Sequence, residues 1–176
     1  RFAWSPSDKS FVIALSTEAD PDTYNLWTTD TVEQSMSQIT KGDNKIMPMW
    51  SPDDTKILYV SKIDSYTYLE LSDEKGENPR ELKVSNKKDA ELFPVWNAAE
   101  NKVIYISKGK FMIMNANATE QKELTKETYV ESPYWLTEKK KRLNLKVTET
   151  GDIWRIFTVN PEGENNKDNN IKLVKK

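Results

Sequence analysis

The sequence contains no cysteine and no histidine in its 176 residues. Without cysteine the chain has no disulfide, no thiolate nucleophile and no zinc-thiolate or iron-sulfur site. Without histidine it has no imidazole metal ligand and no Ser-His or Cys-His nucleophile pair. These absences exclude most familiar hydrolase chemistry, so we expect a protein that is not an enzyme and that uses no metal or other cofactor.

Glycine is scarce, with 5 residues, and neither sign of charge dominates, because 26 Lys and Arg stand against 28 Asp and Glu. A nearly neutral chain has no bulk electrostatic attraction to nucleic acid or to anionic membranes. The sequence also lacks an apolar run of about 20 residues, the length that a transmembrane helix needs. We therefore expect no nucleic-acid partner and no membrane insertion.

The cellular location is less constrained by the composition. A chain without cysteine fits an exported protein, and we expect a periplasmic, cell-surface or secreted one, although a cytoplasmic location stays open. The sequence starts at Arg1 inside an apparent first strand, with no initiator Met and no leader. From this start we expect a part of a longer protein.

What the sequence does contain is an internal repeat, which decides the fold class. A short apolar segment ending in Trp recurs four times, with spacings of 46, 46 and 39 residues. These are Trp4, Trp50, Trp96 and Trp135. A second segment begins seven residues after each, at Phe11, Ile57, Val103 and Arg142. Two further β-prone segments complete each unit, the last ones being Ser37 to Thr40, Arg80 to Lys83, Lys122 to Thr125 and Lys172 to Val174.

Each repeat thus predicts four short strands, rich in Val, Ile, Tyr and Trp and separated by turn residues. Four strands in about 40 to 45 residues is the size of one β-propeller blade. The expected fold class is all-β, a propeller of four-stranded antiparallel blades in one region covering residues 1–176. The expected blades are residues 1–46, 47–92, 93–131 and 132–176.

The second strands predict how the blades pack. A sheet buried on both faces has continuous apolar strands, whereas a sheet with one solvated face alternates. Three second strands are continuous: Phe11 to Leu15, Ile57 to Val60 and Val103 to Ile106. We expect these three sheets to lie between neighbours. In the fourth unit Arg142, Asn144 and Lys146 alternate with apolar residues, which predicts one solvated face at the end of the array.

The repeat resembles the TolB-type, WD-like propeller repeat, whose unit is Pro-x-Trp-Ser-Pro-Asp-Gly, a strand ending in Ser, a strand ending in Met-Asp, and Arg-Leu-Thr. The segments Trp50 through Ser61 and Asn115 through Thr125 are most similar, and the resemblance covers nearly the whole chain. The family implies a ring of six to eight blades, so these four imply part of a larger propeller, with a complete four-bladed ring as the alternative. The family's turn glycine is replaced here by Asp8, Asp54, Glu100 and Lys139.

Two ligand-binding interpretations are weaker than structural ones. The six Trp residues could stack on sugars, but four share one repeat position and Trp27 and Trp154 lie in third strands, so we expect packing. The oxygen-rich segments Asp20 to Asp22 and Asp43 to Asn44 lack the spacing and closing carboxylate of a Ca²⁺ loop. We expect them to be solvated turns.

The leading hypothesis is a non-catalytic TolB-like propeller that serves as a recognition scaffold for another protein or an extracellular ligand. Blade geometry places the turns between second and third strands on the same face as the loops between blades. That loop face is where we expect binding. The candidate residues are Asp20, Asp22, Tyr24, Asp43, Asp64, Tyr66, Lys87, Lys88 and Tyr129.

Two alternatives remain open. The chain could be the accessory, substrate-gating propeller of a larger hydrolase, which would resemble the prolyl-oligopeptidase-type serine peptidases. The parent reading frame would then include an α/β-hydrolase with a Gly-x-Ser-x-Gly elbow. A propeller lyase or hydrolase acting on sugars is the weakest hypothesis, because polysaccharide lyases with similar repeats use a histidine at the metal site.

Overall fold

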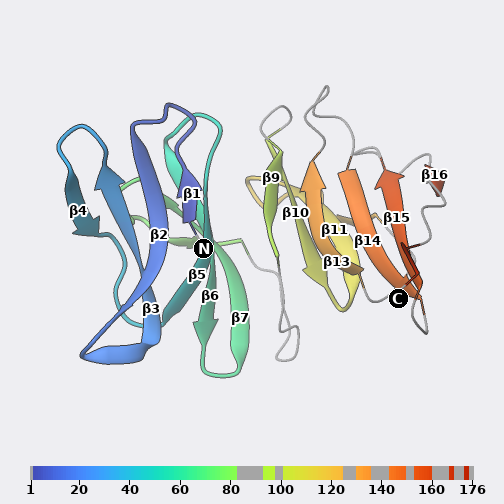
Figure 1. Ribbon diagram of the computed structural model, residues 1–176, viewed down its shortest axis with the longest axis horizontal. Coiled ribbons are helices and arrows are strands. Elements are labelled where there is room, and N and C mark those ends of the chain that lie inside the picture. Colours follow the sequence, from blue (N-terminus) through green and yellow to red (C-terminus); the bar gives the residue numbers. More distant parts are fainter. Residues whose placement is uncertain are drawn as a thin grey trace. The chain divides into compact units, whose positions relative to one another are not determined.

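The computed structural model describes residues 2–82, 93–97 and 101–124, together with the strands at 130–135, 143–149, 153–159, 167–168 and 173–174. The described elements are all β-strands (Figure 1). The chain divides into two compact units, Arg1–Ala90 and Glu91–Lys176, and each is described by itself. Among the described residues, no helix has the length and apolarity needed to cross a membrane.

The first unit contains two four-stranded antiparallel sheets, each with its strands in chain order. Sheet A comprises β1 (Phe2–Trp4), β2 (Ser10–Thr17), β3 (Asp20–Asp30) and β4 (Ser35–Gln38). Sheet B comprises β5 (Asn44–Trp50), β6 (Lys56–Ile63), β7 (Tyr66–Asp73) and β8 (Arg80–Glu81). The second repeat was expected to start at residue 47, whereas its first strand, β5, begins at Asn44.

The second unit contains the sheets of the third and fourth repeats. Sheet C comprises β9 (Val95–Asn97), β10 (Lys102–Ser107), β11 (Lys110–Asn115) and β12 (Lys122–Glu123). Sheet D comprises β13 (Val130–Trp135), β14 (Leu143–Glu149), β15 (Ile153–Val159), β16 (Lys167–Asp168) and β17 (Leu173–Val174). The expected last segment is β17, and β16 is an additional short strand that pairs with β15.

The pairing of sheet D corrects one sequence prediction. Trp4, Trp50 and Trp96 lie opposite Phe11, Ile57 and Val103, seven residues later in each case. Trp135 instead lies opposite Leu143. The fourth second strand is therefore displaced by one residue from the assumed Arg142 start, and a one-residue displacement exchanges the two faces of a strand. A register shift within β13, between Glu131 and Tyr134, accompanies this irregularity.

The turn between first and second strands explains the Trp-Ser-Pro motif. Ser51 is buried, and its Oγ accepts the Lys56 N–H at 2.9 Å and donates to the Asp53 carboxylate at 2.6 Å. The first repeat copies the turn, because the Ser5 Oγ accepts the Ser10 N–H at 3.2 Å. Asp8 and Asp54 take positive φ values of 60° and 58°. At both turns an aspartate therefore occupies the left-handed position that a glycine would take without strain.

The Asp53 carboxylate predicts an acid sensitivity of this turn. Hydrogen bonds from Ser51 and then from Thr55 lower its pKa from 3.8 to about 2. A lowered folded-state pKa stabilises the fold fully above the unfolded-state value, and this stabilisation is lost as the pH falls from about 4 to about 2. Urea unfolding at several pH values should show that the free energy of unfolding falls less over this pH window for Asp53→Asn than for the native chain. Equal losses would contradict the assigned hydrogen bonds.

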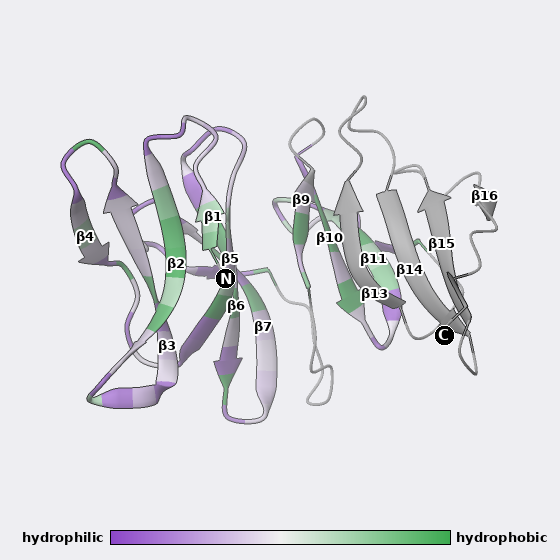
Figure 2. Cartoon of the chain, in the orientation of Figure 1, coloured by the Kyte–Doolittle hydropathy of each residue, from purple (hydrophilic) through white to green (hydrophobic). Residues whose placement is uncertain are grey.

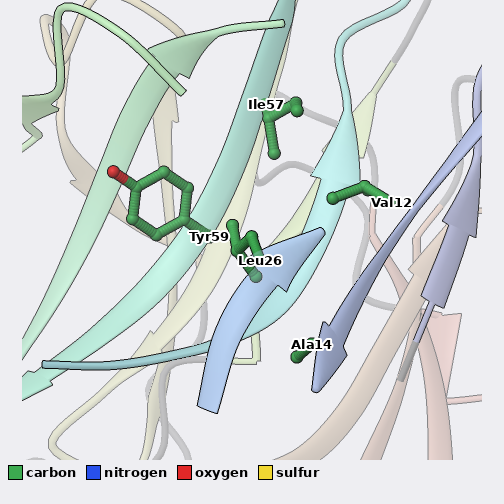
Figure 3. Packing of buried hydrophobic residues seen from close by; sticks show 5 residues of the cluster. All are labelled: Val12, Ala14, Leu26, Ile57 and Tyr59. Carbon is green, nitrogen blue, oxygen red and sulfur yellow. The ribbon is translucent and has the colours of Figure 1, made fainter. Parts of the chain in front are cut away.

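Sheets A and B pack face to face around a small apolar core. Val12, Ala14 and Leu26 of sheet A meet Ile57 and Tyr59 of sheet B, as Figure 3 shows. Trp50 is partly buried and packs against this cluster, as predicted for the repeated Trp. Burial raises the pKa of the Tyr59 phenol, with the neighbouring Glu70 carboxylate adding to the effect. These contacts make sheets A and B one packed body.

The prediction that three sheets are buried on both faces is confirmed for two of them. Residues Ile57 to Val60 are at most 1% exposed and residues Val103 to Ile106 at most 5%. In sheet A, by contrast, Val12 and Ala14 are buried while Phe11 and Ile13 are partly exposed, although β2 carries mostly hydrophobic residues (Figure 2). Trp4 packs edge-on against Phe11 but remains 51% exposed, so the packing predicted for this Trp is incomplete within the described chain.

Candidate binding surface at one end of the first unit

The candidate residues of the first unit lie at one end of its two sheets. This end is formed by the β2–β3 turn, the segment before β5 and the β6–β7 turn, and we call it the loop end. Both hairpin turns lie at the lower end of the unit in Figure 1. The strand register agrees, since Asn44 at the start of β5 lies opposite Lys62, next to the β6–β7 turn.

The β2–β3 hairpin is tighter and its strand longer than the sequence indicated. Thr17 lies opposite Asp20, and the Thr17 Oγ1 accepts the Asp20 N–H at 3.2 Å. The turn therefore holds only two residues, and Asp20, Asp22 and Tyr24 lie on a projecting end of β3 instead of in a loop. Both Asp side chains are exposed, and Tyr24 is 43% exposed. The register between β2 and β3 shifts between Leu15 and Thr17, so Asp22 and Tyr24 have no directly paired residue on β2.

Asn44 anchors the projecting end of β3 to sheet B. Its side-chain oxygen accepts the Tyr24 N–H at 2.7 Å, and its amide nitrogen donates to the Asp22 carbonyl at 3.2 Å. Thr40 adds a buried contact, because its Oγ1 accepts the Leu26 N–H at 2.8 Å. The segment between the sheets is thus fastened to β3 by side chains. No sequence pattern indicates these bonds, because the partners lie far apart along the chain.

A buried lysine lies directly beneath this segment. The Lys45 ammonium donates to the Ser61 hydroxyl at 2.7 Å and lies 3.8 Å from the Asp43 carboxylate. Burying an ammonium group is costly unless it is hydrogen-bonded and paired. Lys45 therefore holds Asp43, half of whose side chain is exposed (51%), at the start of β5.

The β6–β7 turn completes the loop end. Ile63 lies opposite Tyr66, so Asp64 and Ser65 form a two-residue turn in which Asp64 takes a φ of 53°. The ring of Tyr66 stacks on that of Tyr68, with centroids 6.0 Å apart. Desolvation, followed by the Glu81 charge, raises the pKa of the Tyr68 phenol.

Six of the nine predicted residues lie at this end of the sheets. The hairpins bring Asp20, Asp22 and Tyr24 to Asp43, with Asp64 and Tyr66 on the neighbouring turn. Their carboxylates, together with Glu18, outnumber the exposed lysines at this end, Lys41 and Lys62. Lys87, Lys88 and Tyr129 lie outside the described residues. No cluster of side chains able to hold a metal ion occurs in the described part of the chain.

Comparison with solved structures identifies the architecture. TolB from Acinetobacter baumannii is similar over 92% of this chain with a TM-score of 0.73 and 16% sequence identity. The prolyl endopeptidase structure matches 99% of the chain with a TM-score of 0.71 and 14% sequence identity. The nidogen/laminin complex matches 95% of the chain with a TM-score of 0.60 and 9% sequence identity. The chain has the β-propeller fold. The predicted fold class and the resemblance to TolB-type propellers are thereby confirmed at the level of the fold.

The chain spans only part of the solved chains that it resembles. It spans 40% of the TolB chain, 28% of the prolyl endopeptidase chain and 77% of the matched chain in the nidogen/laminin complex. Neither a family model nor a curated protein matches the sequence. At sequence identities of 9–16%, the similarity between this chain and these solved structures shows the fold alone.

Proposed function

We propose that this propeller is a non-catalytic recognition module and that the loop end of its first unit binds another protein or an extracellular ligand. The observation that carries the proposal is the Asn44 anchor, whose two hydrogen bonds fasten the backbone of Asp22 and Tyr24 beside Asp43. A backbone held in this way loses less conformational entropy on binding, and Tyr is enriched among residues that dominate binding energies. The similarity to TolB supports a propeller in this role.

Substitutions on the projecting end of β3 test the recognition role. The triple variant Asp20→Ser, Asp22→Ser, Tyr24→Ser leaves the backbone bond to Asn44 in place, so the fold should keep its stability within about 0.5 kcal/mol. Partner binding should weaken about tenfold or more, since residues that dominate an interface each contribute more than about 1 kcal/mol. Affinity capture from an extract of the source organism, quantified by mass spectrometry, identifies the partner, and interferometry then measures its Kd.

The matched control lies at the opposite end of the same sheet. Lys9→Ser with Glu33→Ser changes exposed charges beside the β1–β2 and β3–β4 turns and should leave capture unchanged. A triple variant that captures and binds the same partner as the native chain would contradict the proposal.

The second candidate is a substrate-gating propeller of a larger hydrolase. Its specific support is the similarity to puromycin hydrolase, with a TM-score of 0.74 over 92% of this chain, and to the prolyl endopeptidases. The complete coding sequence separates the two functions. An α/β-hydrolase domain with a Gly-x-Ser-x-Gly elbow, and cleavage of a fluorogenic prolyl peptide by the complete polypeptide, would favour gating over recognition.

We also propose that the protein is exported, to the periplasm, the cell surface or the medium. The complete absence of cysteine fits this location, since the fold needs no protection from oxidation. Fractionation of the source cells, followed by detection with an antibody against this chain, should place the protein outside the cytoplasm. Recovery with cytoplasmic markers would contradict export.

A further inference from the structure

The outer edge of sheet A is formed by β4, and this edge is open. All four residues of β4 are exposed, and among the described strands β4 pairs with β3 alone. The backbone groups on its other side therefore have no partner strand in the described part of the chain. An edge of this kind is a template for pairing with another strand unless it is short, charged or covered.

The outer edges of sheets B and C are protected, whereas that of sheet A is not. In each of these sheets the residue that follows the outer strand donates its N–H to the third strand, and these residues are Ile39, Leu82 and Leu124. This alignment places Ser37 and Gln38 of β4 at the positions of Arg80–Glu81 in β8 and Lys122–Glu123 in β12. Strands β8 and β12 thus consist of two charged residues each, which discourages edge pairing. Strand β4 is twice as long and carries no charge.

The hydrogen-bond pattern determines which backbone groups of β4 are open. Along an antiparallel strand, residues that bond to one neighbouring strand alternate with residues that bond to the other. Because the Ile39 N–H donates to the β3 backbone, Ser37 and Ser35 also direct their backbone groups to β3. The N–H and C=O groups of Met36 and Gln38 are therefore directed to the open side.

These open groups are symmetric about Ser37. If a second β4 lies antiparallel with its Ser37 opposite that of the first, Met36 of each copy lies opposite Gln38 of the other. Each of these two pairs exchanges two backbone hydrogen bonds, so every open group of both edges is satisfied. The two Ser37 side chains meet on the axis and are small and uncharged. The equivalent pairing of two β12 strands would instead place Lys122 opposite Lys122, and like charges directly opposite are destabilising.

We propose that β4 pairs with β4 of a second copy of this protein, so that two copies of sheet A form one continuous antiparallel sheet across a two-fold axis. The edge is already ordered for this pairing. Before β4, the Asp30 carboxylate accepts the N–H groups of Val32 and Glu33 at 2.8 Å and 2.9 Å. After it, the Thr40 hydroxyl accepts the Leu26 N–H of β3 at 2.8 Å. A strand held at both ends loses little conformational entropy when it pairs.

Cysteine substitutions in the complete polypeptide test this register, because residues 1–176 contain no cysteine. In the proposed pairing the two Ser37 Cα atoms lie about 4.5 Å apart, a separation that a disulfide can bridge. Ser37→Cys should therefore give a covalent dimer when oxidised glutathione is added. Ser35→Cys is the matched control, on the same strand and also exposed. Its Cα atoms would lie about 14 Å apart, because four residues separate them along the pair.

The yield of covalent dimer from Ser37→Cys should exceed that from Ser35→Cys at least tenfold, with the native polypeptide as the reference for links elsewhere. Equal yields would indicate random collision, a higher yield from Ser35→Cys would indicate another register, and no dimer from either would indicate an unpaired edge. Each of these three results overturns the proposal.

Photo-crosslinking in the source cells identifies the occupant independently. With Ser37 replaced by p-benzoylphenylalanine, illumination should give a product of twice the mass of the polypeptide, linked between two β4 strands. A product of any other mass would assign the edge to a different protein, and an unlinked polypeptide would leave it without an occupant, so either result contradicts the proposal. Strand β4 contributes no residue to the loop end, so the recognition role does not depend on these results.

Discussion

Gly76→Ala should destabilise the chain by about 3 kcal/mol or more, whereas Gly42→Ala should cost about 1 kcal/mol. Both glycines have positive φ values, 76° and 87°, so both variants suffer the strain of a left-handed residue. A Cβ on Gly76 would also overlap the Ile39 carbonyl oxygen and lie 2.7 Å from its carbonyl carbon, whereas a Cβ on Gly42 meets no atom within 4 Å. The difference between the two variants therefore measures the clash alone.

The close contact between Gly76 and Ile39 matters because it joins the two sheets of the first unit. Gly76 lies in the turn that follows β7 of sheet B, and Ile39 follows β4 of sheet A and packs against the shared core. Relieving the overlap would force the turn and the segment apart. Urea unfolding followed by circular dichroism gives both free energies, and equal losses for the two variants would show that the turn does not pack on Ile39.

Leu26→Ala should cost about 2 to 5 kcal/mol, the range for removing a large aliphatic side chain from a core. Leu26 is fully buried between sheets A and B, and its backbone bonds to Thr40 and Ile39 prevent β3 from moving to fill the cavity. Val32→Ala is the control, because Val32 is 81% exposed and its truncation should change the free energy of unfolding by less than about 0.5 kcal/mol. Similar values for the two variants would contradict the packing of sheet A on sheet B.

The fold could be predicted because its signals are local. A buried Ser holds each Trp-Ser-Pro turn through a bond to a residue five positions later, and strand patterns have a period of two, so both recur visibly in the sequence. The one failure of the register, at Leu143, comes from one extra position between Trp135 and its partner. The register shift in the first strand does not explain it, because β5 has the same shift and Trp50 still pairs with Ile57. A single extra position of this kind leaves no mark on a sequence pattern.

The candidate site could be predicted only in outline, because its details depend on contacts between distant residues. The sequence predicted that these turns lie at one end of the sheets, because blade connectivity alone determines which turns share an end. It could not reveal that Asn44 fastens Tyr24, 20 positions away, or that Lys45 is buried against Ser61. The solvent exposure of Trp4 could not be predicted for the same reason, because the burial of this side chain depends on a neighbouring sheet and not on its own repeat.

A crystal structure of the complete polypeptide tests the central claim, that these repeats are blades of a larger propeller. The account predicts a single ring of more than four blades, about six to eight, in which sheets A and B pack as they do here and Trp4 lies buried against an additional blade. A ring closed by these four repeats alone, or a Trp4 side chain that remains half exposed in the complete protein, would contradict it.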